Sequence, residues 1–216
     1  MIDFNNLPAK DKIYYQDESC VIYCADCREI IPQLIGIPDL VATDPPYPEY
    51  NEDHGRAWKD IDLQPVLWSL PSVTQFVFWP TLGEVPLPLA DNSAIHIWWK
   101  RNSQSAYRYE RIVERFGQKN CYVFDDRVIS SPVTAQFARD TFYNHPTQKP
   151  LSLILKLLQI HKERNCVLDP FMGSGTTLVA AKRLGRKAIG IEIEEKYCEI
   201  AAKRLAQSVM NLDTPA

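Results

Sequence analysis

Four consecutive residues, Asp44-Pro45-Pro46-Tyr47, place a carboxylate, two prolines and an aromatic ring after a short apolar stretch at residues 39–43. The stretch is typical of a buried strand, and the prolines end it because they fix φ and carry no N–H group. Open α/β sheets bind ligands at the carboxyl ends of such strands. We therefore predict that Asp44 and the Pro45 carbonyl accept N–H bonds from a flat base with an exocyclic amine, while Tyr47 stacks on its ring. A plain strand-ending turn is the alternative.

A second motif, at residues 167–177, has the order strand, turn and helix, with Gly173 and Gly175 in the turn and a helix predicted from residue 176 to 184. Glycines let the backbone pass close to a ligand, but this is not a P-loop, because Thr176 stands where the lysine should be. The next strand, residues 187–193, carries Glu192 about 20 residues after the glycines, the usual offset for a carboxylate that binds ribose hydroxyls. A solvated cap for a helix at residues 194–207 is the alternative for Glu192.

Together the two motifs resemble those of the beta-type amino-methyltransferases of DNA, in which a DPPY motif precedes an FxGxG motif, over about residues 13–207. The resemblance implies S-adenosylmethionine as cofactor, with Asp26 at its adenine and the run at residues 145–150 at its methionine end. Ala25 stands where many members have glycine, and Pro48 and Glu49 stand where asparagine is common. The cofactor-binding residues that this resemblance predicts are Asp26, Cys27, Asp44, His145, Thr147, Lys149, Asp169, Phe171, Gly173, Ser174, Gly175, Thr176 and Glu192.

The same resemblance implies methyl transfer to the exocyclic N6 amine of adenine in DNA, because DPPY rather than SPPY is typical of adenine enzymes. Its catalytic residues are Asp44, Pro45, Pro46 and Tyr47, and the target base is expected to flip out of the duplex against Tyr47. His145 belongs to a stiff connector, and displacement at a sulfonium requires no general base. Cytosine-N4 in DNA, adenine in RNA and a non-catalytic nucleic-acid-binding subunit of the same fold are the alternatives.

A basic segment at residues 100–119 carries six positive against two negative side chains in a chain whose net charge is −3. With Tyr107 and Tyr109 interleaved, it is the predicted nucleic-acid surface, and a surface helix with ordinary solvated charge is the alternative. The region that follows, residues 120–144, is short, so we expect short or relaxed sequence specificity, or a contribution from residues 48–59 or from a second subunit in a homodimer. The predicted nucleic-acid-binding residues are Lys100, Arg101, Arg108, Arg111 and Arg115.

The cysteine spacing imitates a metal site. Cys20, Cys24 and Cys27 have the spacing of an iron–sulfur site, but residues 20–24 are predicted to form a strand, which holds Cys20 and Cys24 about 13 Å apart. The six cysteines of the chain are therefore predicted to be reduced thiols, without a metal. No apolar run reaches the ~18 residues of a membrane span, and the first residues lack the regions of a signal peptide, so a cytoplasmic location is expected.

The order of elements predicts a doubly wound, Rossmann-like α/β methyltransferase fold with a mostly parallel sheet and an antiparallel edge. We expect one domain over residues 1–216, with a reduced target-recognition insert at about residues 100–144. Residues 1–12 are expected to form a loose terminus and residues 13–24 a hairpin. The predicted helices are 26–34, 61–70, 107–116 and 151–163, and the predicted strands include 75–79, 94–99 and one or two within 121–129.

Overall fold

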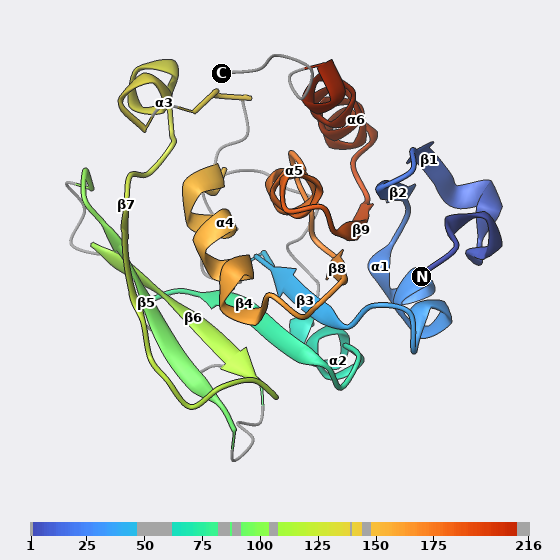
Figure 1. Ribbon diagram of the computed structural model, residues 1–216, viewed down its shortest axis with the longest axis horizontal. Helices are drawn as coiled ribbons and strands as arrows, with labels where there is room; N and C mark the ends of the chain where they lie inside the picture. Colours follow the sequence, from blue (N-terminus) through green and yellow to red (C-terminus); the bar gives the residue numbers. More distant parts are fainter. Residues whose placement is uncertain are drawn as a thin grey trace.

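The computed structural model describes residues 2–46, 62–81, 87, 92–103, 108–138, 140–143 and 148–210. In this part of the chain nine strands form one sheet, in the order β1-β2-β9-β8-β3-β4-β6-β5-β7 (Figure 1). The strands are β1 (Ile13–Gln16), β2 (Cys20–Cys24), β3 (Leu40–Thr43), β4 (Thr74–Trp79), β5 (Ala94–Lys100), β6 (Tyr109–Arg115), β7 (Val123–Asp126), β8 (Cys166–Asp169) and β9 (Lys187–Glu192).

The centre of the sheet is parallel. Strands β2, β9, β8, β3 and β4 pair in parallel with their neighbours. Antiparallel pairing occurs at the β1 edge and around β6, which lies between β4 and β5 and runs against both. This confirms the predicted fold class. The carboxyl ends of β4 and β5 and the first residues of β6 consequently lie at one edge of the sheet.

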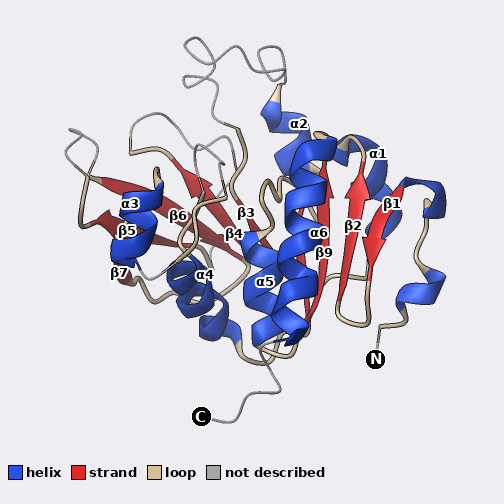
Figure 2. Cartoon of the chain, turned by 90° about the horizontal axis from the view of Figure 1, so that it is seen from above, coloured by secondary structure: helices blue, strands red, loops and turns tan. Residues whose placement is uncertain are grey.

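Helices cover both faces of the sheet. On one face lie α4 (Leu151–Leu158), α5 (Thr176–Arg183) and α6 (Glu195–Met210), side by side in Figure 2. On the other lie α1 (Cys27–Ile30), its 3-10 extension η3 (Ile31–Leu34) and α2 (Leu63–Trp68). A further helix, α3 (Pro132–Ala138), precedes α4 in the chain. None of the helices in the described ranges is long and apolar enough to cross a membrane.

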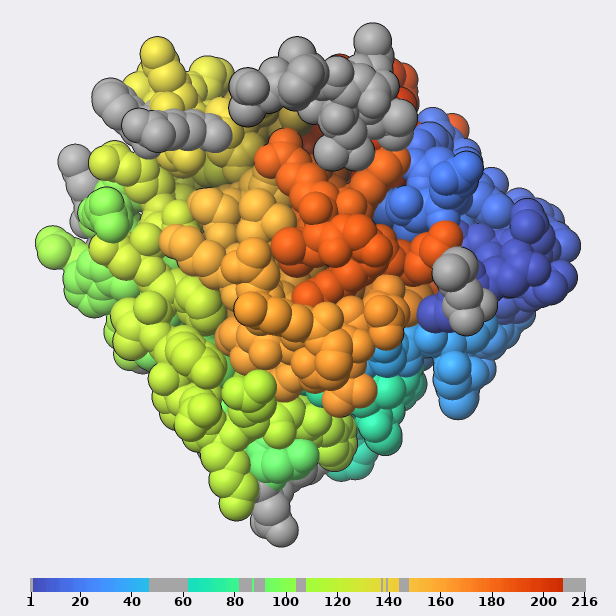
Figure 3. Space-filling model, in the orientation of Figure 1, coloured from blue at the N-terminus to red at the C-terminus, as the bar shows by residue number. Residues whose placement is uncertain are grey.

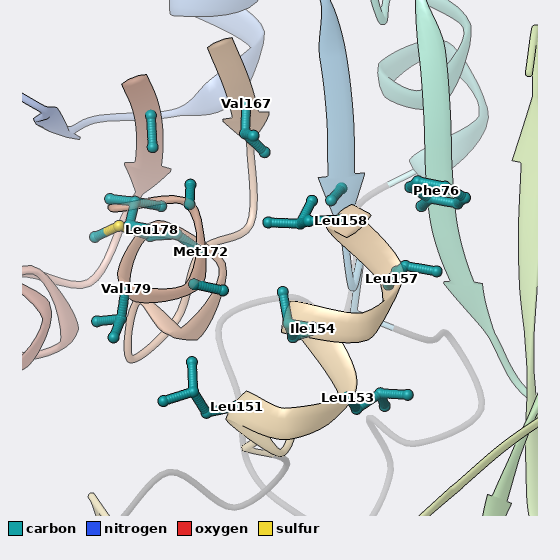
Figure 4. Close-up of a cluster of buried hydrophobic side chains, with 14 of the residues drawn as sticks. Phe76, Leu151, Leu153, Ile154, Leu157, Leu158, Val167, Met172, Leu178 and Val179 are labelled. Carbon is teal, nitrogen blue, oxygen red and sulfur yellow. The ribbon is translucent and has the colours of Figure 1, made fainter. Parts of the chain in front are cut away.

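Helix α4 and the 3-10 turn η5 (Gln159–His161) occupy the predicted helix at residues 151–163. Its leucines and Ile154 face the sheet and α5 and pack with Phe76, Val167, Met172, Leu178 and Val179 (Figure 4). Pro150 precedes the helix, where its fixed φ and missing N–H do no harm. In Figure 3 the α4 and α5 residues, in orange, lie between the blue N-terminal segment and the green residues of β5 to β7.

Two predicted elements are wrong. Residues 107–116 are not a helix, because Tyr109–Arg115 form strand β6. In that strand Glu110, Ile112 and Glu114 share one face, because side chains alternate with a period of two. Glu110 and Glu114 are four residues apart, a spacing that also fits one face of a helix. The terminus is not loose, because the 3-10 turns η1 (Phe4–Asn6) and η2 (Lys10–Lys12) bring Phe4 into the core. The hairpin at residues 13–24, the helix within 61–70 and the strands at 75–79 and 94–99 are confirmed.

A buried carboxylate joins β5, β6 and η5 at the edge opposite the carboxyl ends of the parallel strands. Glu114 is fully buried, and its two oxygens lie 2.8 Å from His96 Nε2 and 2.7 Å from His161 Nε2. Burial alone would raise the pKa of Glu114, but the bonds to His161 and His96 outweigh it and lower the pKa to about 2. Burial alone would lower the pKa of His161, but Glu114 outweighs it and raises that pKa above its usual value.

This cluster predicts how stability varies with pH. Replacing Glu114 by glutamine should destabilise the fold by about 3 kcal/mol, the scale of breaking a buried ion pair. Because the folded pKa of Glu114 is depressed, its contribution is fully present above the ordinary value of 4.5 and is lost as pH falls towards 2. Because the folded pKa of His161 is raised, its contribution is present below 6.5 and is lost as pH rises through the folded value. The free energies of unfolding of wild type and Glu114→Gln, measured with urea, should therefore differ most between pH 4.5 and pH 6.5. A difference that does not change with pH would contradict this assignment.

Candidate active site

The candidate site lies where β3 and β8 separate. The chain leaves β3 for β4 on one side and β8 for β9 on the other, so the strand order reverses between β3 and β8. Pairing joins Leu40 to Val167 and Val41 to Leu168, and the strands then continue to Thr43 and Asp169. Such a reversal is where open α/β sheets bind ligands. Both predicted motifs lie at this point.

Asp169 holds the two strands together at the separation. Its Oδ1 accepts a hydrogen bond from Thr43 Oγ1 at 2.9 Å and one from the Phe171 N–H at 3.2 Å. The Thr177 side chain, in the first turn of α5, also bonds to this carboxylate. Burial raises the pKa of Asp169 to about 6, and the nearby charge of Asp44 adds to the shift. Asp169 is therefore a structural link as well as a predicted cofactor residue.

The glycine turn approaches β9 and α6 closely. Gly173 and Gly175 have φ values of 50° and 79°, in the left-handed region that glycine adopts without strain. A Cβ on Gly175 would lie 2.7 Å from the Ala201 side chain, and one on Gly190 in β9 would lie 2.4 Å from Met172 Sδ. Figure 4 shows Met172 beside Leu178 at the start of α5. The turn is thus closely packed against α6 and β9.

Arg204 of α6 also holds this turn, and sequence reasoning missed it. Its guanidinium Nη1 donates to the Ser174 carbonyl at 2.6 Å and lies within 3.2 Å of the Ser174 and Thr176 hydroxyls. The side chain is buried, with the Tyr143 ring 4.1 Å from its guanidinium carbon. Arg204 lies far along the chain on a helix of ordinary composition, so no spacing in the sequence pointed to it.

Glu192 ends β9 at the ligand edge, as predicted. Its carboxylate accepts hydrogen bonds from the Gly173 N–H at 3.0 Å and the Glu194 N–H at 2.9 Å. Burial raises the pKa of Glu192 to about 7, against the lowering effect of these backbone bonds. The carboxylate therefore changes charge near neutral pH. It also ties the glycine turn to the tip of the next strand.

A pocket of about 350 Å³ of empty space, counting open solvent at its mouth, lies beside Glu192. It brings together four of the predicted cofactor residues from three elements. Asp26 caps α1 by accepting the Arg28 N–H at 2.9 Å, and the bond from the Arg28 side chain lowers its pKa. The residues that line the pocket are Asp26, Cys27, Arg28, Val66, Pro170, Phe171, Ile191, Glu192 and Ile193.

Asp44 follows β3 and pairs with a lysine from the segment before α4. Its Oδ2 lies 2.5 Å from Lys149 Nζ. Lys149 in turn lies 3.4 Å from Glu110 of β6, whose other oxygen lies 2.5 Å from Lys100 Nζ. Pro45 and Pro46 continue the chain from Asp44. Tyr47, His145 and Thr147, which complete the predicted set, lie outside the described residues.

The five basic residues predicted for nucleic acid do not share one surface. Arg115 is buried and donates to the Gln75 side chain at 3.0 Å, so including it was wrong, because a buried guanidinium cannot reach a phosphate. Arg111 donates to the Pro80 carbonyl at 2.8 Å, and Lys100 is paired with Glu110. Arg101 is exposed and paired with Asp125.

Arg108 is exposed at the start of this segment, and its role in nucleic-acid binding stays a prediction. Tyr107 lies outside the described residues.

The cysteines of the imitated metal site lie where the strand prediction placed them. Cys20 is the first residue of β2, Cys24 is its last, and Cys27 begins α1. Burial raises the pKa of the Cys20 and Cys27 thiols to about 12. No group of three or more His, Cys, Asp or Glu side chains in the described ranges is arranged to hold a metal ion.

The parallel sheet, the glycine turn at the strand reversal and the acid at the tip of the next strand define a doubly wound, Rossmann-like α/β fold. A family model described as DNA methylase, covering N6 and N4 methyltransferases, matches residues 95–203, which are 109 of the 216 residues. The chain belongs to this DNA methylase family.

Curated relatives match over a shorter stretch. The chain is 58% identical over 62 residues to the Type II methyltransferase M2.LlaDCHI of Lactococcus lactis subsp. cremoris, a match that covers 28% of this chain and 23% of the relative. It is 55% identical over 64 residues to the Type II methyltransferase M.HinfI of Haemophilus influenzae, covering 29% of this chain and 18% of the relative. The chain thus matches less than a quarter of the length of these relatives.

Solved structures match over most of the chain. A crystal structure of an M1.HpyAVI–SAM complex has a TM-score of 0.54 at 23% identity, covering 86% of this chain and 98% of that one. The cytosine-N4-specific PvuII DNA methyltransferase has a TM-score of 0.59 at 14% identity, covering 89% of this chain and 88% of that one. At these identities the likeness shows a shared fold.

Proposed function

We propose that this protein is an S-adenosylmethionine-dependent DNA methyltransferase that methylates the exocyclic N6 amine of adenine. The observation that carries the proposal is the hydrogen bond between Thr43 and Asp169, which seats the DPPY strand beside the glycine turn. Membership of the DNA methylase family supports amino methylation at N6 or N4. The choice of adenine rests on DPPY standing where cytosine enzymes typically have SPPY.

The described residues offer S-adenosylmethionine a fitting site. Glu192 presents a carboxylate at the strand tip for ribose hydroxyls, and Phe171 and Asp26 line the adjoining pocket, which suits an adenine ring and its amine. The complex of M1.HpyAVI with SAM, in the same fold, supports this assignment. When bound, the cofactor supplies a methyl group on a sulfonium. The residues of this chain need only bind, orient and exclude water.

Asp44 is the residue that orients the target amine. A carboxylate accepts an N–H bond from the exocyclic amine and aims the nitrogen lone pair, and Lys149 pairs with that carboxylate at 2.5 Å. The carbonyl of Pro45 is the second acceptor. The amine is out of reach inside a duplex, so the base is flipped out and Tyr47 stacks on it. After transfer the nitrogen is cationic and loses its proton readily.

Asp44→Ala should abolish methyl transfer, because loss of one placed acceptor slows a reaction by ~10²-fold or more. The assay is incubation with labelled S-adenosylmethionine and unmethylated DNA or RNA, followed by nucleoside mass spectrometry. Asp44→Asn tests the charge at constant shape, and Glu199→Gln, an exposed acid paired with Lys203, is the control. Wild-type turnover by folded Asp44→Ala would contradict the assignment of Asp44. A methylated nucleoside other than N6-methyladenine would show that the target is not the N6 amine of adenine.

Glu192→Gln should weaken S-adenosylmethionine binding by ~1.5–3 kcal/mol, the scale of a hydrogen bond to a charged group. In wild type the affinity should rise as pH increases through about 7, because the carboxylate is partly protonated below that value. Asp169 titrates near 6, so the interval from 7 to 8 isolates Glu192. Calorimetry at several pH values should show this rise in wild type and Glu199→Gln and its loss in Glu192→Gln. Equal affinities of wild type and Glu192→Gln for S-adenosylmethionine would show that another residue makes the ribose contact.

Binding of DNA through phosphates should weaken steeply with salt, by about one log unit per log of salt for each contact. Arg108→Ala should flatten that slope by about one and reduce binding to all sequences alike. Lys203→Ala, which removes an exposed cation of α6, is the matched control. Fluorescence anisotropy over a salt series measures both slopes, and an unchanged slope for Arg108→Ala would exclude this residue from the DNA surface.

A further inference from the structure

Four charged side chains alternate in sign across the candidate site, from β3 to β5. Asp44 Oδ2 lies 2.5 Å from Lys149 Nζ, Lys149 Nζ lies 3.4 Å from Glu110 Oε2, and Glu110 Oε1 lies 2.5 Å from Lys100 Nζ. Sequence reasoning assigned roles to the other three and none to Glu110. The register of β6, which pairs with both β4 and β5, brings Glu110 to the edge of the sheet where Asp44 lies.

The middle of this row is removed from water. Lys149 is buried, and the side chains of Glu110 and Lys100 are 12% and 14% exposed. Two rings lie under the Lys149 ammonium, Phe78 at 5.1 Å and Trp98 at 5.7 Å from ring centre to Nζ. Lys149 therefore contacts acids and aromatic faces together, and its ammonium has little freedom to move.

Stability alone does not account for these buried charges. Apolar residues of similar volume are often as stabilising as a buried ion pair, or more so, because desolvation offsets the attraction. The row also has a buried oxygen, Glu110 Oε2, with no hydrogen-bond partner among the described residues, and it is this oxygen that faces the Lys149 ammonium. A role in placing Asp44, which ends the row, accounts for both features.

We propose that Glu110 is a positioning residue for the methyl transfer, acting through Lys149 to fix the rotation of the Asp44 carboxylate. The inference rests on the proposed function. Lys149 holds one Asp44 oxygen, and Glu110 holds Lys149 from the opposite side. Lys100 pairs with the other Glu110 oxygen and so weakens the electrostatic attraction between Glu110 and Lys149. This balance keeps Lys149 nearer to Asp44 than to Glu110.

The charge of Glu110 is the property to test. Glu110→Gln keeps the shape and removes the charge, so Lys149 loses its second acid and Asp44 its fixed orientation. The expected result is a reduction of kcat by up to about tenfold, since small misplacements of a catalytic group cost up to ~10²-fold. The Kd for S-adenosylmethionine and the KM for DNA should change less than kcat, because Glu110 meets the predicted cofactor and DNA residues only through Lys149 and Lys100. Glu110→Asp should restore part of kcat, and Glu199→Gln should match wild type.

A second measurement does not depend on activity. Lysine-selective ¹⁵N NMR of the folded protein should show a slowly exchanging ammonium signal that is absent from Lys149→Met and therefore belongs to Lys149. In Glu110→Gln this signal should shift and exchange faster with water, and in Glu199→Gln it should not change. Thermal unfolding of each variant confirms that a folded protein is compared.

The outcomes separate this inference from the proposed function. A kcat lowered by more than either binding constant changes, partial recovery in Glu110→Asp and a perturbed Lys149 signal would establish it. Wild-type kcat in Glu110→Gln, or an unperturbed Lys149 signal, would overturn it. If wild type methylates neither DNA nor RNA, the proposed function fails. The NMR comparison then still decides whether Glu110 holds Lys149.

Discussion

A single buried hydrogen bond, from Thr43 Oγ1 to Asp169 Oδ1 at 2.9 Å, connects the two halves of the site. The halves are separated by more than a hundred residues and leave the reversal point in opposite directions along the sheet. In a buried setting such a bond is strong, and losing either partner leaves the other unsatisfied. Asp169 also accepts the Phe171 N–H and the bond from Thr177, so the same carboxylate sets the start of the glycine turn and of α5. A shift of β3 relative to β8 would therefore displace Asp44 relative to the glycine turn.

Three of the acids at this edge, Asp44, Asp169 and Glu192, have different kinds of partner. Asp44 has the Lys149 ammonium as a partner. Asp169 and Glu192 accept hydrogen bonds but form no ion pair within the described part of the chain, and burial raises their pKa values to about 6 and about 7. Near neutral pH the charges of Asp169 and Glu192 therefore respond to their surroundings. A cationic or hydroxyl-bearing ligand would favour their charged forms.

Local signals in the sequence were enough for the strands, the glycine turn and the acid at the tip of β9, because each is a short pattern with its own period or residue type. They failed where the deciding contacts are distant in the chain. In β6 the acids Glu110 and Glu114 are spaced as on the surface of a helix. Only the pairing with β4 and β5, and the partners Lys149 and His161 from elsewhere in the chain, show that the two acids share one face of a strand. Arg204 was missed for the same reason, because its partners lie about thirty residues away in the glycine turn. Burial of Arg115 likewise depends on Gln75, in a neighbouring strand.

Strand β6 also couples the two charged clusters of the protein. Glu110 and Glu114 lie on one face of this strand, the first beside Lys149 at the ligand edge and the second between His96 and His161 at the opposite edge. A slip of one residue would turn both acids to the other face, and a slip of two would carry Glu110 about 7 Å from its place. The register that seats Glu114 between the histidines is thus the register that presents Glu110 to Lys149. The cluster that stabilises the far edge consequently fixes the geometry at Asp44, although no side chain of that cluster reaches the site.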